Sequence, residues 1–162
     1  MTRAYIGLGA NLGDARRTVK TAAGELARTG GVNHLTLSPL YRSAPVDSSG
    51  PDYVNAVAMI ETSLSARSLL EVLQHIECRH GRERPYQNAP RTLDLDLLLF
   101  GVQTIDEPDL TVPHPRMHQR AFVLKPLMDV APDLCLAQGP LDVLLTACAD
   151  QDLAPLPEDR KR

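Results

Sequence analysis

The segment Leu93-Asp94-Leu95-Asp96-Leu97-Leu98-Leu99-Phe100 carries the clearest strand pattern in the chain. Side chains of a strand point alternately to its two faces, so this alternation places Asp94 and Asp96 on one face and the intervening leucines on the other. Gly101 follows directly and is expected to end the strand. The pattern therefore predicts a strand with one apolar face and one face that carries two carboxylates.

Outward from this strand, segments with strand-like and helix-like patterns alternate. Strands are predicted at 4–10, 32–41 and 53–62; helices are predicted from Asp14 to the glycines at 30–31 and from Ser65, a helix cap, to about Arg79. With the strand at 93–100 the order is β-α-β-β-α-β, which is the split βαβ order of the ferredoxin-like fold. We therefore predict an α+β fold, with helices packed on an antiparallel sheet.

The remaining third of the chain is expected to decorate that core. It contains proline-rich loops around 108–115 and two helical stretches, near 117–130 and 141–149. We predict a single domain over residues 1–149. Residues 150–162, with prolines and a closing Lys-Arg pair, are predicted to form a frayed tail.

Composition excludes several classes of protein. The chain has 162 residues, 43% of them hydrophobic, which suits one soluble domain, and it has no apolar run of the roughly 20 residues that a membrane span needs. Three cysteines without a CxxC pair favour a reducing compartment, so a cytoplasmic location is expected. The net charge of −3 argues against general binding of nucleic acid or anionic membranes.

Arginine is nevertheless unusually frequent, since 14 of the 17 basic residues are arginines. Three of them precede the strand with the two aspartates, and Arg116 and Arg120 follow a Pro-His-Pro turn. The α-carbons of Asp94 and Asp96 should lie about 6 to 7 Å apart. Paired carboxylates near arginine side chains suit Mg²⁺ and a polyphosphate. A solvated face of an edge strand with ordinary surface arginines is the alternative interpretation.

Other motifs are less specific. The glycines of Gly7-Leu-Gly9-Ala-Asn11-Leu-Gly13 do not have the spacing of a dinucleotide-binding fingerprint and are interpreted as structural. Zinc at His114 and His118 is disfavoured because prolines flank His114 and keep it off a helix. His114 facing a phosphate and His114 as an ordinary histidine both stay open. Cys78 is interpreted as a structural thiol.

Longer motifs resemble one family. The run Pro90 to Leu98 followed by Val112-Pro113-His114-Pro115-Arg116 resembles the 6-hydroxymethyl-7,8-dihydropterin pyrophosphokinases of folate biosynthesis. The likeness extends, in the family's order, over nearly all of the chain before the tail. It also includes the glycine-rich start, Tyr41-Arg42, the segment 51–56, Glu77, Arg82, Arg84 and Arg120-Ala121-Phe122.

The resemblance implies an enzyme that transfers pyrophosphate from ATP to the hydroxymethyl oxygen of the pterin and releases AMP. Two Mg²⁺ ions are expected on Asp94 and Asp96, which are the expected catalytic residues together with Arg82 and Arg91. The residues expected around ATP are Gln74, Glu77, Arg82, Arg84, Arg91, Leu97, Thr111, His114 and Arg120. Around the pterin, Tyr53 and Phe122 would stack on the two faces of the ring, while Asn55 and the backbone near Ser43 and Val46 would read its polar edge.

Some positions depart from the family pattern. Gln87-Asn88 stand where a further basic residue is usual, the loop 43–47 lacks the usual threonine and glycine, and Asp109 stands where some members carry arginine. The loop from 82 to 91 is expected to close over ATP as a lid. We expect a monomer that acts on small molecules and binds neither nucleic acid nor membrane. The competing hypotheses are a two-metal nucleotidyl transferase and, as a non-enzyme, an RNA-binding module.

Overall fold

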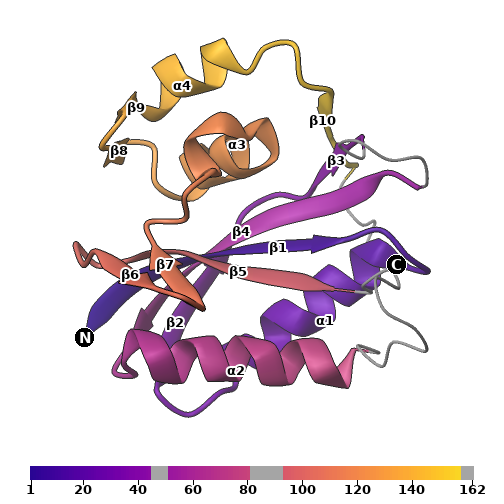
Figure 1. Cartoon of the computed structure of the whole chain (residues 1–162). Helices are drawn as coiled ribbons and strands as arrows, with labels where there is room; N and C mark the ends of the chain where they lie inside the picture. The colour runs from indigo at the N-terminus through magenta and orange to yellow at the C-terminus, as the bar shows by residue number, and fades with distance from the viewer. Residues whose placement is uncertain (45–50, 81–92, 158–162) are drawn as a thin grey trace.

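A central antiparallel sheet organises the computed structural model, which describes residues 1–44, 51–80 and 93–157 (Figure 1). In chain order its elements are β1 (Thr2–Ala10), α1 (Ala15–Ala27), β2 (Val32–Leu37), β3 (Tyr41–Ser43), β4 (Tyr53–Thr62), α2 (Ala66–Arg79), β5 (Asp94–Phe100), β6 (Ile105–Glu107), β7 (Leu110–Val112), the 3-10 helix η1 (Met117–Gln119), α3 (Ala121–Val130), β8 (Cys135–Leu136), β9 (Gly139–Pro140), α4 (Leu141–Ala147) and β10 (Leu153–Pro155). The strand order is β10-β3-β4-β1-β5, and β2 also pairs with β4. The predicted α+β, ferredoxin-like fold is confirmed.

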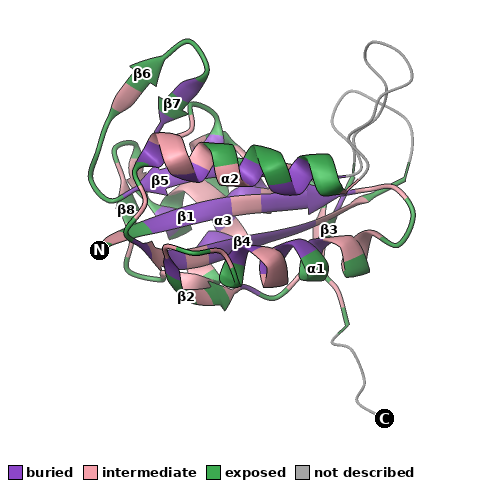
Figure 2. Cartoon of the chain, turned by 90° about the horizontal axis from the view of Figure 1, so that it is seen from below, coloured by how far each residue is buried: buried purple, intermediate pink, exposed green. Residues whose placement is uncertain are grey.

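Helices cover both faces of this sheet. Figure 1 shows α1 and α2 on one face and α3 and α4 on the other. The first layer forms a core with apolar residues of β1, β4 and β5, including Ile6, Ile60 and Leu95; the second layer packs residues such as Leu124 and Leu127 against Val57. Figure 2 shows purple, buried residues along the middle strands and green, exposed residues on the outer faces of α1 and α2. The sheet therefore separates two apolar layers.

Side chains cap the first two helices, and the cap at Ser65 is the one that the sequence predicts. The Asp14 carboxylate accepts a hydrogen bond from the backbone N–H of Arg17 at 3.2 Å, and the Ser65 hydroxyl accepts one from Ser68 at 3.1 Å. Each cap satisfies a backbone donor that has no partner within the first helical turn. None of the described helices is long and apolar enough to cross a membrane.

The predicted strand at 32–41 is interrupted in the structure. β2 ends at Leu37 and β3 begins at Tyr41, because Pro39 has no N–H to donate to the sheet. Ser38 supports the break: its N–H donates to the carbonyl of Val57 at 2.9 Å, and its hydroxyl accepts from the N–H of Val57 at 3.0 Å. Both short strands still pair with β4.

The prediction of a frayed tail is wrong for residues 151–157. β10 pairs with β3, the N–H of Leu156 donates to the carbonyl of Leu40 at 2.9 Å, and Arg16 donates to the carbonyl of Pro157 at 2.7 Å. A strand of three residues that contains proline gives little sequence signal, and an edge strand tolerates it. Residues 158–162 lie outside the described part of the chain.

Candidate active site

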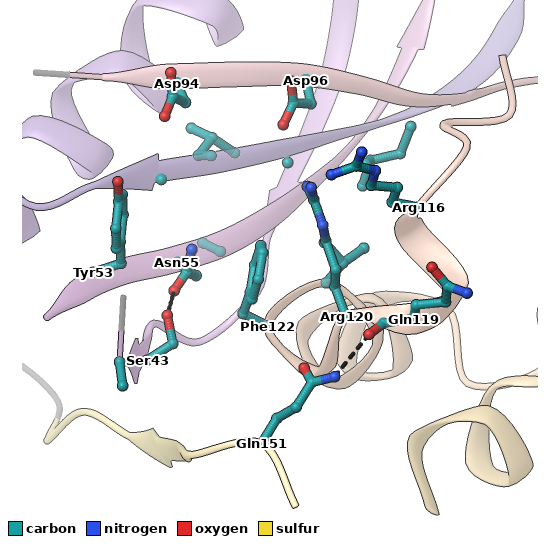
Figure 3. Close-up of a pocket in the computed structure, with 17 residues that line it drawn as sticks. Ser43, Tyr53, Asn55, Asp94, Asp96, Arg116, Gln119, Arg120, Phe122 and Gln151 are labelled. Atoms are coloured by element: carbon teal, nitrogen blue, oxygen red, sulfur yellow. Dashed lines mark hydrogen bonds between the residues drawn. The ribbon is translucent and has the colours of Figure 1, made fainter. Parts of the chain in front are cut away.

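A cavity of about 470 Å³ lies between the sheet and the start of α3 (Figure 3). Its walls come from strands β1, β3, β4 and β5, from the segment 116–123, and from one residue close to β10. The residues that line it are Gly7, Leu8, Gly9, Ser43, Ala44, Tyr53, Asn55, Ala56, Asp94, Asp96, Leu98, Arg116, Gln119, Arg120, Phe122, Val123 and Gln151. Seven predicted site residues therefore meet at one cavity.

The register of the sheet creates the cavity floor. β1 runs between β4 and β5, so that Gly9 pairs with Asn55 on one side and with Asp94 on the other, while Gly7 pairs with Asp96. Glycine leaves open the space between these polar side chains. A Cβ atom at Gly9 would lie 3.2 Å from the amide nitrogen of Asn55, which is a tight contact. Gly7 and Gly9, which the sequence indicated as structural, thus also line the site.

Asp94 and Asp96 lie on the cavity side of β5, as the alternation predicts (Figure 3). Asp94 is half-buried and Asp96 is exposed. Glu77, at the end of α2, is buried and accepts a hydrogen bond from the N–H of Leu95 at 2.8 Å. β5 ends the strand order, so this N–H needs a partner outside the sheet ladder or from water. Glu77 therefore fixes the backbone between the two aspartates.

Two aromatic side chains project into the cavity from different elements. Figure 3 shows Tyr53 on β4 and Phe122 on α3, with Asn55 between them. Both rings are only partly buried. The guanidinium carbon of Arg120 lies 5.5 Å from the centroid of the Phe122 ring, which places a cation beside that aromatic face. The cavity therefore offers two aromatic rings to a flat ligand.

Ser43 and Asn55 form a buried polar pair at the base of the cavity. The Ser43 hydroxyl donates to the side-chain carbonyl of Asn55 at 2.5 Å. The opposite end of the amide, its NH₂ group, lies near Gly9 at the cavity floor. Tyr41, also on β3, donates to Asp129 on α3; burial, together with this hydrogen bond, raises the pKa of the Tyr41 hydroxyl. Side chains of β3 therefore form hydrogen bonds with both β4 and α3.

His114 lies close to the carboxylate side of the cavity without lining it. The backbone N–H of His114 donates to the carbonyl of Leu98 at 2.9 Å, and the imidazole Nδ1 accepts from the backbone N–H of Arg116 at 3.1 Å. Burial lowers the pKa of the imidazole; Asp96 opposes this shift, and Arg120 and Arg116 add to it. A neutral ring that accepts at Nδ1 carries its proton on Nε2, so that His114 can donate a hydrogen bond.

Other predicted residues lie elsewhere. The Leu97 side chain is in the core beneath the sheet, and Gln74 on α2 and Thr111 on β7 are exposed, none of them lining the cavity. Val46, Arg82, Arg84 and Arg91, together with the predicted lid at 82–91, lie outside the described residues. Their expected roles stay predictions.

Three polar residues that line the cavity, Arg116, Gln119 and Gln151, were absent from the predicted site set. Arg116 was recognisable as an arginine after the Pro-His-Pro turn, whereas Gln119 and Gln151 carry no motif. Gln151 in particular belongs to the segment predicted to fray. Only the three-dimensional structure brings it to the cavity wall.

Carboxylates, arginines and aromatic rings around one cavity of a ferredoxin-like sheet suit an enzyme that acts on small phosphorylated and aromatic substrates. The family model described as 7,8-dihydro-6-hydroxymethylpterin-pyrophosphokinase matches residues 5–132. The chain belongs to this family.

Individual relatives agree with that assignment. A Pseudomonas aeruginosa protein named 2-amino-4-hydroxy-6-hydroxymethyldihydropteridine pyrophosphokinase is 45% identical over 157 residues, covering 96% of this chain and 97% of the relative. A Bacillus subtilis protein of the same name is 41% identical over 128 residues, covering 78% and 77% of the two chains. The predicted family and the pyrophosphokinase activity in folate biosynthesis are confirmed.

Solved structures agree on the fold. The Plasmodium falciparum HPPK-DHPS wild type with pteroate matches with a TM-score of 0.71 at 14% identity. The match covers 91% of this chain but 42% of that one. The present chain therefore spans less than half the length of that structure, and the likeness concerns the fold of the shared part.

Proposed function

We propose that the cavity is where this chain transfers the β,γ-pyrophosphoryl group of ATP to 6-hydroxymethyl-7,8-dihydropterin. The hydroxymethyl oxygen attacks the β-phosphorus of ATP and loses its proton to solvent. The bond between the β-phosphorus and the α,β-bridging oxygen breaks, and AMP leaves with that oxygen and the electron pair. The observation that carries the proposal is the meeting of Tyr53, Phe122 and Asn55 with Asp94 and Asp96 in one cavity. A flat ring and a polyphosphate can be brought together there.

The aromatic half of the cavity is proposed to bind the pterin. Tyr53 and Phe122 stack on opposite faces of the ring, since aromatic rings favour offset or edge-to-face contacts with another flat ring. The Asn55 amide, held by Ser43, bonds to the polar edge of the pterin. An oriented amide rejects rings that lack a matching donor or acceptor, because its own buried groups would be left unpaired.

The carboxylate half is proposed to receive the triphosphate. Arg120 and Arg116 offer guanidinium donors from the wall opposite Asp96, and His114 can donate from Nε2. Phosphoryl transfer requires mainly positioning of the reactants and neutralisation of charge, so no nucleophilic side chain is needed. We also assign positions around ATP to Arg82, Arg84 and Arg91, and to Gln74, Glu77, Leu97 and Thr111.

Asp94 and Asp96 fit magnesium. Within the described residues no cluster of three or more His, Cys, Asp or Glu side chains could hold a metal ion. Mg²⁺ nevertheless commonly takes one or two carboxylates and completes its shell with water and phosphate oxygens. Two oxygen-donor side chains on one strand face, beside a phosphate site, match that preference. Bound there, Mg²⁺ would neutralise phosphate charge; the two aspartates would hold it.

We further propose that the chain acts as a monomer in the cytoplasm and has no nucleic-acid partner. The net charge of −3 argues against a nucleic-acid partner. Light scattering of the purified protein tests the monomeric state, and a filter-binding assay with RNA tests the absence of a nucleic-acid partner. A stable dimer, or salt-sensitive RNA binding without ATP, would contradict them.

Analysis of the nucleotide product tests the proposed reaction. The protein is incubated with MgCl₂, ATP and the hydroxymethyl-dihydropterin, and the nucleotides are separated by chromatography. AMP formed in a one-to-one ratio with pterin diphosphate is the expected result. Release of ADP, release of free pyrophosphate as from a nucleotidyl transferase, or no turnover would refute the proposal. Omitting the pterin serves as the control.

A further inference from the structure

Gln151 makes two hydrogen bonds to the backbone on either side of Arg120. Its side-chain carbonyl accepts from the N–H of Ala121 at 2.8 Å, and its side-chain NH₂ donates to the carbonyl of Gln119 at 2.8 Å, the second bond being drawn in Figure 3. One amide side chain thus joins the last residue of η1 to the first residue of α3. Arg120 is the single residue between them.

The backbone at Arg120 needs such support. Arg120 is extended, with φ −121° and ψ 112°, between two helical segments, and its own side chain makes no capping bond to α3. The N–H of Ala121 lies in the first helical turn and has no acceptor within the helix. Gln151 supplies that acceptor from outside the helix, and the Arg120 side chain is left to point into the cavity.

Gln151 is itself held in place by its neighbours. Its N–H donates to the carbonyl of Cys148 at 2.9 Å, and β10 begins two residues later and pairs with β3. β3 carries Ser43, which orients Asn55. The segment from Gln151 to β10 therefore contacts two walls of the cavity. One wall carries Arg120 and Phe122, and the other carries Ser43 and Asn55.

We infer that Gln151 is a positioning residue for the transfer reaction: it sets the direction in which Arg120 meets the phosphates. This inference rests on the proposed function of the cavity. Small displacements of groups that contact reacting atoms reduce rates strongly, by about 10²-fold for roughly 1 Å. Loss of two hydrogen bonds that flank Arg120 is a milder change, and we expect kcat/KM to fall about 10-fold.

The test uses Gln151→Met, which keeps the length of the side chain and removes both hydrogen bonds. Gln103→Met is the matched control, since Gln103 is exposed in the turn after β5 and does not line the cavity. The expected result is a loss of about 10-fold in kcat/KM for Gln151→Met and none for Gln103→Met, with both variants folded at the assay temperature. If Gln151→Met does not fold, Gln151→Glu replaces it in the same assay. This variant keeps the acceptor for the Ala121 N–H and removes the donor to the Gln119 carbonyl.

A double-mutant cycle separates positioning from a general structural role. If Gln151 acts through Arg120, Gln151→Met should change the residual kcat/KM of Arg120→Ala less than about 2-fold. Equal losses in both backgrounds, or wild-type activity of Gln151→Met, would overturn the inference. Hydrogen exchange at the Ala121 amide provides a readout without turnover. Exchange should be slower in the wild type than in Gln151→Met, and equal rates would overturn the inference. This readout is independent of turnover: a wild type that failed to release AMP would refute the proposed function and leave the exchange result to be judged separately.

Discussion

The Ser43 hydroxyl donates a hydrogen bond of 2.5 Å to the side-chain carbonyl of Asn55, and both residues are buried at the base of the cavity. An amide can present either its carbonyl or its NH₂ group to a ligand, and this bond decides which. The carbonyl oxygen faces Ser43, so the NH₂ group is the end that lies near Gly9. The selectivity of the site for the polar edge of the ring thus depends on a residue of the short edge strand β3.

Replacing Ser43 by alanine should weaken pterin binding without abolishing turnover. A neutral hydrogen bond contributes about 0.5–1.5 kcal/mol, which corresponds to an increase of roughly 2- to 12-fold in the KM for the pterin. The KM for ATP should change little. Ser63→Ala, at an exposed serine after β4, is the control. An unchanged pterin KM in Ser43→Ala would show that the Asn55 amide needs no such orientation.

Replacing Gly9 by alanine should disturb the same amide from the other side. The new Cβ would lie 3.2 Å from the Asn55 nitrogen, whereas a Cβ at Gly7 would meet Leu98 at an ordinary distance of 3.6 Å. We therefore expect Gly9→Ala to raise the dissociation constant of the pterin more than Gly7→Ala does, as measured by calorimetric titration. Equal effects of the two substitutions would contradict the assigned position of the amide.

Asp96→Ala should remove metal-dependent turnover while leaving pterin recognition largely intact. Metal ions supply several kcal/mol of charge stabilisation in such reactions, so kcat should fall by about 10²-fold or more. Steady-state rates measured against MgCl₂ concentration check this. Asp106→Ala, at an exposed aspartate of β6, is the control. Comparable activity of Asp96→Ala would mean that the metal site is misplaced.

Glu77 should matter for stability as well as for activity. Glu77→Ala leaves the N–H of Leu95 without its side-chain acceptor, and we expect the free energy of unfolding in urea to fall by about 1–3 kcal/mol. Glu77→Gln retains an acceptor oxygen and should be milder. If alanine and glutamine variants unfold at the wild-type urea concentration, Glu77 does not support β5, and only its expected role beside the nucleotide would remain.

Patterns within single elements made most of the fold predictable. Alternation along 93–100, the Ser65 cap and the helical spacing of leucines in α2 depend on local geometry alone. The interruption at Pro39 has a local cause, the missing N–H of proline, which the strand prediction passed over. The pairing of β10 was missed because it rests on a long-range partner, β3. Short strands bury little surface by themselves and therefore leave little trace in the sequence.

The site was predictable where a residue type limits the chemistry, and less so where position alone decides. Paired aspartates and clustered arginines suggest metal and phosphate in any fold, and the family resemblance located the aromatic pair. Gln151 shows the opposite case, because a glutamine near a proline-rich end has no special chemistry until the fold places its amide beside Arg120.

A crystal structure of the protein with Mn²⁺, a nonhydrolysable ATP analogue and the hydroxymethyl-dihydropterin tests the site assignment most directly. Our account predicts anomalous signal from manganese beside Asp94 and Asp96, and the pterin ring between Tyr53 and Phe122 with its polar edge on Asn55. Manganese bound away from both aspartates, or the pterin bound outside this cavity, would contradict it.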